Sequence, residues 1–175
     1  MLIHHLSTDQ ALTDFLCADC RENNVGVNFS ATISPSDYVV IKIDSYFNKM
    51  IKPKNPAGID CLIVQKCQDD NYKLYLVELK NIEQLRDIKH IRLKFQNCFD
   101  IFMSDKFRPY FYDETINFTS IQLVFVSTTH ENKSRKDKLQ KNTRLDALLS
   151  LRPCRFANRL YAISFEEPDP LIVPC

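Results

Sequence analysis

AGIDCLIVQKCQDDNYKLYLVELK, residues 57–80, is the stretch of the sequence that decides the fold. Two apolar runs flank the polar turn QDDN, and this pattern predicts a β-hairpin with strands at 59–66 and 72–79. Asp60 stands at the start of the first strand and Glu78 near the end of the second, roughly symmetric about the turn. Directly opposed residues on antiparallel strands have Cβ atoms about 4.5 to 5.5 Å apart. We therefore expect the two carboxylates to be neighbours.

Side chains on a strand alternate between its two faces, so Glu78 and Lys80 should point the same way and Leu79 the other way. Two adjacent carboxylates repel each other unless a cation lies between them, and Mg²⁺ binds through one or two carboxylates while keeping exchangeable waters. Such an ion polarises a phosphoryl oxygen and acidifies the attacking water, and a nearby lysine can position that water or stabilise developing negative charge. The alternative interpretation of a Glu-x-Lys pair is an exposed, solvated strand face.

The remaining chain predicts helices and strands in an order typical of α/β proteins. The predicted elements are a helix at 8–22, an extended piece at 25–33, a helix at 34–52 with a strand at 39–43 as the alternative, a helix at 82–104, a strand at 121–128 and a last strand at 160–165. The apolar stripe of the 82–104 helix comprises Leu85, Ile88, Ile91, Phe95, Phe99 and Phe102. We expect an α/β fold with a mixed central β-sheet and helices on its faces.

The composition limits the class of protein. A chain of 175 residues fits a single domain, 1–175, and its two glycines exclude a Gly-rich phosphate-binding loop. The seven cysteines are irregularly spaced apart from the Cys17-x-x-Cys20 pair, so we expect reduced thiols rather than a zinc site. The N-terminal stretch lacks the features of a signal peptide, and no apolar run approaches the roughly 20 residues of a membrane span. We expect a cytoplasmic protein without membrane contact.

The pattern of Asp60, residues 61–77, and then Glu78-Leu79-Lys80 resembles the active-site motif of the PD-(D/E)xK nuclease superfamily, with Ile59 where the motif has Pro. This superfamily includes restriction endonucleases, Holliday junction resolvases and RecB-type nucleases. Its core consists of a helix, a β-meander that carries the motif, a helix and a further strand. The order of elements predicted here matches it over about residues 34–127. The resemblance implies a restriction endonuclease-like core.

The resemblance also implies roles for individual residues. Asp60 and Glu78 would be catalytic, metal-binding acids, and Lys80 the catalytic lysine. Many members add an acid from a preceding helix, for which Asp44 is our first choice and Asp37 the second. Some members use a Gln on the helix after the motif, and Gln96 would then contact nucleic acid.

A basic segment at 130–144 holds six Lys or Arg against two acidic residues and suits phosphate contacts. The residues that we expect to bind nucleic acid in it are Lys133, Arg135, Lys136 and Lys138. The alternative interpretation of this segment is a solvated loop and helix start.

The sequence thus predicts a Mg²⁺-dependent (or Mn²⁺-dependent) nuclease that hydrolyses DNA phosphodiester bonds and is similar to a small restriction endonuclease or a resolvase. The resemblance implies a homodimer, because cutting duplex DNA usually needs two active sites. Three alternatives stay open. The chain could be an inactive nuclease-fold DNA-binding module, an interaction subunit of a larger complex, or a metal-cluster nuclease that uses Cys17 and Cys20.

Overall fold

The computed structural model describes residues 2–22, 25–52, 56–80, 85–127 and 150–175, without the side chains of residues 85–89. Strands β6 (Cys61–Lys66) and β7 (Asn71–Leu79) form the predicted antiparallel hairpin, in which Cys61 pairs with Val77 and Lys66 with Tyr72. The turn between them contains Asp69 and Asp70 at φ 54° and 55°. Asp tolerates this left-handed conformation better than most residues, which is why QDDN closes the hairpin.

The hairpin lies at the centre of a six-stranded mixed sheet with the order β1-β5-β6-β7-β8-β11. Strand β1 (Leu16–Cys17) pairs antiparallel with β5 (Tyr38–Lys42), β5 with β6, and β6 with β7. Strand β8 (Asn117–Val126) runs parallel to β7, and β11 (Ile163–Glu166) runs parallel to β8. A parallel connection needs a long crossover, and a helical segment supplies it between β7 and β8. The predicted α/β fold with a mixed central sheet is confirmed.

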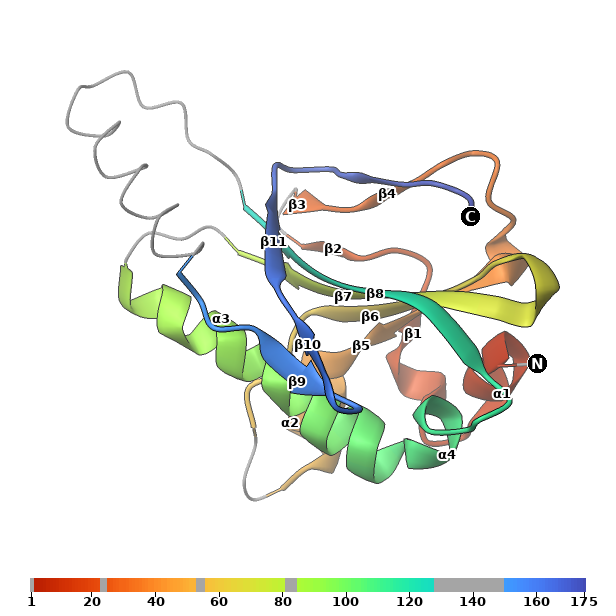
Figure 1. Ribbon diagram of the computed structural model, residues 1–175, viewed down its shortest axis with the longest axis horizontal. Helices are drawn as coiled ribbons and strands as arrows, with labels where there is room; N and C mark the ends of the chain where they lie inside the picture. The colour runs from red at the N-terminus through yellow and green to blue at the C-terminus, as the bar shows by residue number, and fades with distance from the viewer. Residues whose placement is uncertain (1, 23–24, 53–55, 81–84, 128–149) are drawn as a thin grey trace.

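Helices cover one face of this sheet (Figure 1). They are α1 (Leu2–Thr8), α2 (Ile43–Met50), α3 (Leu85–Asn97), its π-helical continuation η4 (Cys98–Lys106), and α4 (Arg108–Phe111). Short strands cover the opposite face: β2 (Arg21–Glu22), β3 (Val25–Gly26), β4 (Asn28–Phe29) and β12 (Leu171–Ile172). The predicted sheet with flanking helices is therefore confirmed, and among the described residues the segment that follows β1 forms short strands on the other face.

The long helix buries the predicted stripe. Ile91, Phe95, Phe99 and Phe102 are all buried against the sheet, whereas the side chains of Leu85 and Ile88 lie outside the described set. Beside the helix, the hairpin of β9 (Cys154–Phe156) and β10 (Arg159–Tyr161) packs its Phe156 ring on Phe99. Helix α3 is thus fixed on two sides, by the sheet and by β9.

The helix predicted at 8–22 was wrong, and the one predicted at 34–52 is confirmed only for α2, Ile43–Met50. Within 8–22 the chain forms a short 3-10 turn, η1 (Thr13–Phe15), followed by β1 and β2. Residues 34–52 divide into the 3-10 turn η2 (Pro35–Asp37), strand β5 and helix α2. The β-branched run at 39–41 pairs with β6, so sheet packing decides its conformation in favour of the alternative strand. The last predicted strand is divided between β10 and β11.

The cysteines also differ from expectation. Cys20 is bonded to Cys61 and Cys67 to Cys175, whereas Cys17, Cys98 and Cys154 are free. The prediction of reduced thiols was wrong for these four residues. With Cys20 in a disulfide, the Cys17-x-x-Cys20 pair is not available as two thiolate ligands of a cluster. In the described portion of the chain, none of the helices has the length and apolar character needed to cross a membrane.

Gly58 gives the first testable prediction. A Cβ built at this position would lie 2.9 Å from the Asp44 Cα and 3.0 Å from the Phe47 Cδ2. Backbone cannot yield as a flexible side chain does, so Gly58→Ala should destabilise the protein by about 1 to 3 kcal/mol. Urea unfolding measures the change, and Ala57→Ser, at the exposed neighbouring position, is the control. Equal stability of both variants would contradict the close packing of this loop on α2.

Candidate active site

Two carboxylates occupy the end of an apolar row on the helix-covered face of the sheet. In this row Leu62 of β6 is paired with Leu76 of β7, and both are fully buried. One pleat further, the same alternation places Asp60 and Glu78 side by side beyond the last paired residues. The Leu79 N–H donates a hydrogen bond to Asp60 Oδ2 at 2.6 Å, which holds the two strand ends together. The hairpin therefore brings the predicted acids together.

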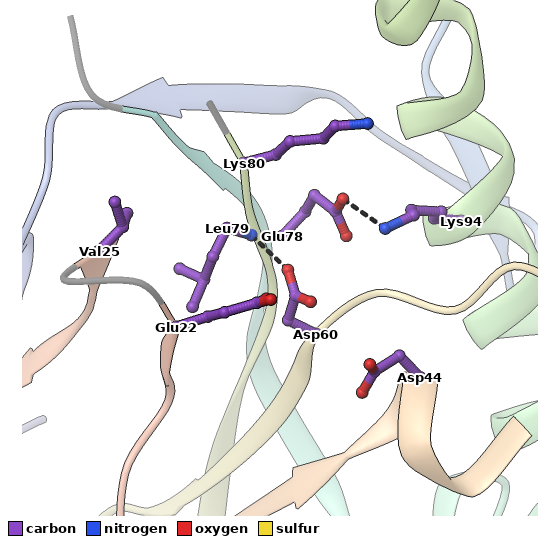
Figure 2. Close-up of a pocket in the computed structure, with 8 residues that line it drawn as sticks. All are labelled: Glu22, Val25, Asp44, Asp60, Glu78, Leu79, Lys80 and Lys94. Atoms are coloured by element: carbon purple, nitrogen blue, oxygen red, sulfur yellow. Dashed lines mark hydrogen bonds and ion pairs between the residues drawn. The ribbon is translucent and has the colours of Figure 1, made fainter. Parts of the chain in front are cut away.

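Both acids line a cavity of about 440 Å³ (Figure 2). Its lining consists of Glu22, Val25, Asp44, Asp60, Glu78, Leu79, Lys80 and Lys94. In Figure 2, Lys80 and Glu78 project from one side of β7 and Leu79 from the other, as strand alternation predicts. The Lys80 N–H donates to the Val126 carbonyl at 3.0 Å, so the end of β7 stays attached to β8. The cavity thus contains all three residues of the predicted catalytic set.

The two acids are buried. Only 7% of Asp60 and 1% of Glu78 is exposed to solvent. Burial, followed by the charge of Asp60, raises the pKa of Glu78 to about 8. Burial also raises the pKa of Asp60 to about 6, and the Leu79 N–H partly offsets this. Side chains this costly to ionise need a compensating positive charge.

Lys94 supplies positive charge from α3. Its Nζ lies 2.5 Å from Glu78 Oε1. Burial alone would lower the pKa of Lys94, but the Glu78 and Asp60 carboxylates outweigh it and the pKa is raised. The other oxygen, Glu78 Oε2, is buried and has no hydrogen-bond partner within the described structure. Lys94 therefore compensates the charge of the two acids only in part. The Glu78 Oε2 atom is left for a further ligand.

Asp44 reaches the cavity from the first turn of α2. The Asp44 N–H donates to the Ile59 carbonyl at 3.0 Å, and the neighbouring Ile43 N–H donates to the Asp60 carbonyl at 3.2 Å. The Asp44 carboxylate is half-buried and accepts a 2.6 Å hydrogen bond from the Ser45 N–H. The second choice, Asp37, precedes β5 at the end remote from Asp60, because Tyr38 pairs with Gln65 and Lys42 with Cys61.

The cavity residues form a sparse ligand set for the implied metal. In the ranges that the structure describes, no group of three or more His, Cys, Asp and Glu side chains is arranged to hold an ion. Asp44 is thus a cavity residue outside any three-ligand group. Mg²⁺, however, needs only one or two carboxylates and completes its shell with water and substrate oxygens. Asp60 and Glu78, with the unpartnered Oε2 atom, fit that requirement.

Gln96, the one predicted nucleic-acid contact among the described residues, is absent from the cavity lining. The Gln96 amide donates to the Arg155 carbonyl and accepts from the Arg155 N–H, both at 3.0 Å. Gln96 therefore joins α3 to β9, and its contact with nucleic acid stays a prediction. Lys133, Arg135, Lys136 and Lys138 lie outside the described residues.

Sequence reasoning missed Glu22 and Lys94. A signal existed for Lys94, because it follows Ile91 by three residues and so borders the buried stripe of the helix. For Glu22 there was none, since its segment was expected to be helical. In the structure the Cys20–Cys61 disulfide attaches this segment to the strand that begins beside Asp60. Figure 2 shows the Glu22 carboxylate directed toward Asp60.

Comparisons of the chain with protein-family models, curated proteins and solved structures found no match. Functional inference therefore depends on the residues and geometry described above.

The raised pKa values of the two acids predict how stability changes with pH. Below their ordinary values of 3.8 and 4.5 both groups are protonated whether the chain is folded or unfolded. Above these values the folded state binds more protons than the unfolded state, so stability falls until the pH passes about 8. Lys94 contributes no slope here, because it is charged in both states.

In metal-free buffer, Tm of the wild-type protein should fall by on the order of 10 °C between pH 5 and pH 8. Glu78→Gln should remove most of this decline, because the amide cannot ionise. Glu114→Gln, which alters an exposed carboxylate, is the control. Calorimetric scans at several pH values measure how Tm changes with pH. An equal decline of Tm in wild type and Glu78→Gln would refute the unfavourable ionisation of the buried Glu78 carboxyl group.

Proposed function

We propose that this protein is a Mg²⁺-dependent (or Mn²⁺-dependent) nuclease that hydrolyses DNA phosphodiester bonds. The observation that carries the proposal is the convergence of Asp60 and Glu78 at one end of the central hairpin, with an unpartnered Glu78 oxygen and Lys80 in the same cavity. Buried acids with raised pKa values in a cleft are typical of functional sites. A purely structural core would place apolar residues at these positions, as it does at Leu62 and Leu76.

The topology supports a restriction endonuclease-like core. Strands β5, β6 and β7 form an antiparallel meander, α3 follows, and β8 is added parallel to β7. Apart from α2, which lies between β5 and β6, this order agrees with the one that the resemblance to PD-(D/E)xK nucleases implies. The motif also falls at the expected positions in it, the start of the second meander strand and the end of the third.

In the proposed mechanism, Asp60 and Glu78 hold the ion and Lys80 acts on the reacting groups. The Leu79 N–H fixes one Asp60 oxygen, so that carboxylate is oriented before any ligand arrives. When bound, Mg²⁺ would supply Lewis-acid polarisation of the phosphoryl oxygen and acidify water. The Lys80 ammonium would orient the attacking water or stabilise negative charge that develops on the phosphate. Orientation of the charged groups before reaction is what makes such stabilisation effective.

The remaining expectations are parts of the same proposal. DNA binding would use the basic segment 130–144, and cutting both strands of a duplex would use a homodimer. A cytoplasmic location stays a prediction, and the two disulfides argue against it because such bonds are typical of oxidising compartments.

A second candidate function is a nuclease-fold DNA-binding or interaction module without activity. The ion pair between Lys94 and Glu78 favours it, because a carboxylate that already has a cationic partner can be a structural element. The two functions differ in whether purified protein cleaves nucleic acid when Mg²⁺ is added.

The test is incubation of the protein with supercoiled plasmid, linear duplex, single strands and a four-way junction, with and without Mg²⁺. We expect Mg²⁺-dependent cleavage of at least one substrate.

Lys80→Ala should lower the rate at least about 100-fold, the scale of losing one group that stabilises a transition state. The fold should remain intact by circular dichroism, because this half-buried side chain contributes little to packing. Lys49→Ala, which removes an exposed lysine paired with Asp14, is the control. An intact substrate panel would favour the binding module, and undiminished cleavage by Lys80→Ala would remove the assigned role.

A further inference from the structure

The Glu78 carboxylate is already occupied on one side by a cation of the protein itself. Lys94 Nζ contacts Oε1 at 2.5 Å, and the lysine side chain is 24% exposed against 1% for the glutamate. Lys94 also interacts electrostatically with Asp60 and Asp44. Among the described residues, its ammonium is therefore the cation in direct contact with an acid that the proposed function assigns to the metal.

A divalent cation and this ammonium would compete for the same carboxylate. Metal coordination needs ionised oxygens, and two cations at one carboxylate repel each other. Glu78 Oε2 is unpartnered within the described residues, but Oε1 is engaged by Lys94. Lys80 imposes no comparable competition, since its side chain forms no ion pair with any described residue.

The helix backbone next to Lys94 is held by hydrogen bonds to two other parts of the chain, β9 and the loop at Ala57. Gln96 binds β9 through two hydrogen bonds, and the Asn97 side chain donates to the Ala57 carbonyl at 2.8 Å. A shift of the whole helix would break these contacts. The flexible Lys94 side chain can leave Glu78 by rotation about its own bonds, toward the side where it is exposed to solvent.

We infer that Lys94 is a positioning residue that competes internally with the divalent cation: it holds Glu78 when no ion is bound and is displaced when one binds. This inference rests on the proposed function. It assigns to Lys94 control of metal affinity, a role distinct from that of Lys80. The same lysine keeps the two acids compatible with folding before the ion arrives.

The decisive measurement is the affinity for Mg²⁺ and for Mn²⁺ alone, by isothermal titration calorimetry at one pH and ionic strength. Lys94→Met should bind both ions about tenfold more tightly than wild type, the scale of one charge-assisted hydrogen bond removed from the competing state. Lys49→Met, which removes an exposed ammonium elsewhere, should leave the affinity unchanged. A Lys94→Met affinity equal to or weaker than that of wild type would overturn the inference and leave the proposed function standing. An equal gain in Lys49→Met would also overturn it. Absence of binding to both wild type and Lys94→Met would overturn the inference and the proposed metal site together.

A second measurement uses the wild-type protein, so it decides the matter if Lys94→Met fails to fold. Acetylation of lysines, followed by mass spectrometry, reports how accessible each ammonium is. Addition of Mg²⁺ should make Lys94 react severalfold faster, whereas Lys49 should react at the same rate. A Lys94 rate that Mg²⁺ leaves unchanged or lowers would show that the ammonium stays on Glu78.

Discussion

The interaction on which the site depends is the meeting of two buried carboxylates at one end of the β6–β7 hairpin. Leu62 and Leu76 are the neighbouring residues on the same face of the hairpin, and both are apolar and fully buried. The helix-covered core therefore changes from apolar to charged at Asp60 and Glu78. Charges in such a place are costly unless hydrogen bonds and opposite charges surround them. The Leu79 N–H and the Lys94 ammonium meet part of that need. The sheet, the long helix and the α2 loop all converge on this end.

Two further parts of the chain bring acidic groups to the place where Asp60 and Glu78 meet. The loop at Gly58 lies against the start of α2, which brings Asp44 to the cavity rim. The Cys20–Cys61 disulfide ties the N-terminal segment, with Glu22, to the beginning of β6. Both contacts are made by residues within two positions of Asp60, namely Gly58 and Cys61. The arrangement concentrates negative charge around one small volume, which would attract a cation and would also impede an approaching phosphate unless a cation were present.

Much of this could be predicted from the hairpin and little from the flanking segments. Alternation within residues 59–79 fixes which face each side chain occupies, and a polar turn fixes the pairing, so the neighbourhood of Asp60 and Glu78 followed from local rules. The segment 8–22 has helical spacing, but its conformation is decided by pairing with β5 and by the bond from Cys20 to Cys61. Contacts this distant in sequence leave no periodic signal. Glu22 was missed for that reason, and so were the hydrogen bonds that join Gln96 to β9.

The two lysines of the cavity have different physical situations, although sequence motifs treat only one as significant. Lys80 extends from a strand end and forms no ion pair with the described residues, so its charge is available to an incoming group. Lys94 extends from a helix held at Gln96 and Asn97 and is paired with a nearly inaccessible carboxylate. An ammonium in that position lowers the cost of keeping Glu78 ionised inside the protein. In the proposed function, the stability of the empty fold and its affinity for the cation would be opposed through this one side chain. A site that folded without its ion and bound it later would need such a compromise.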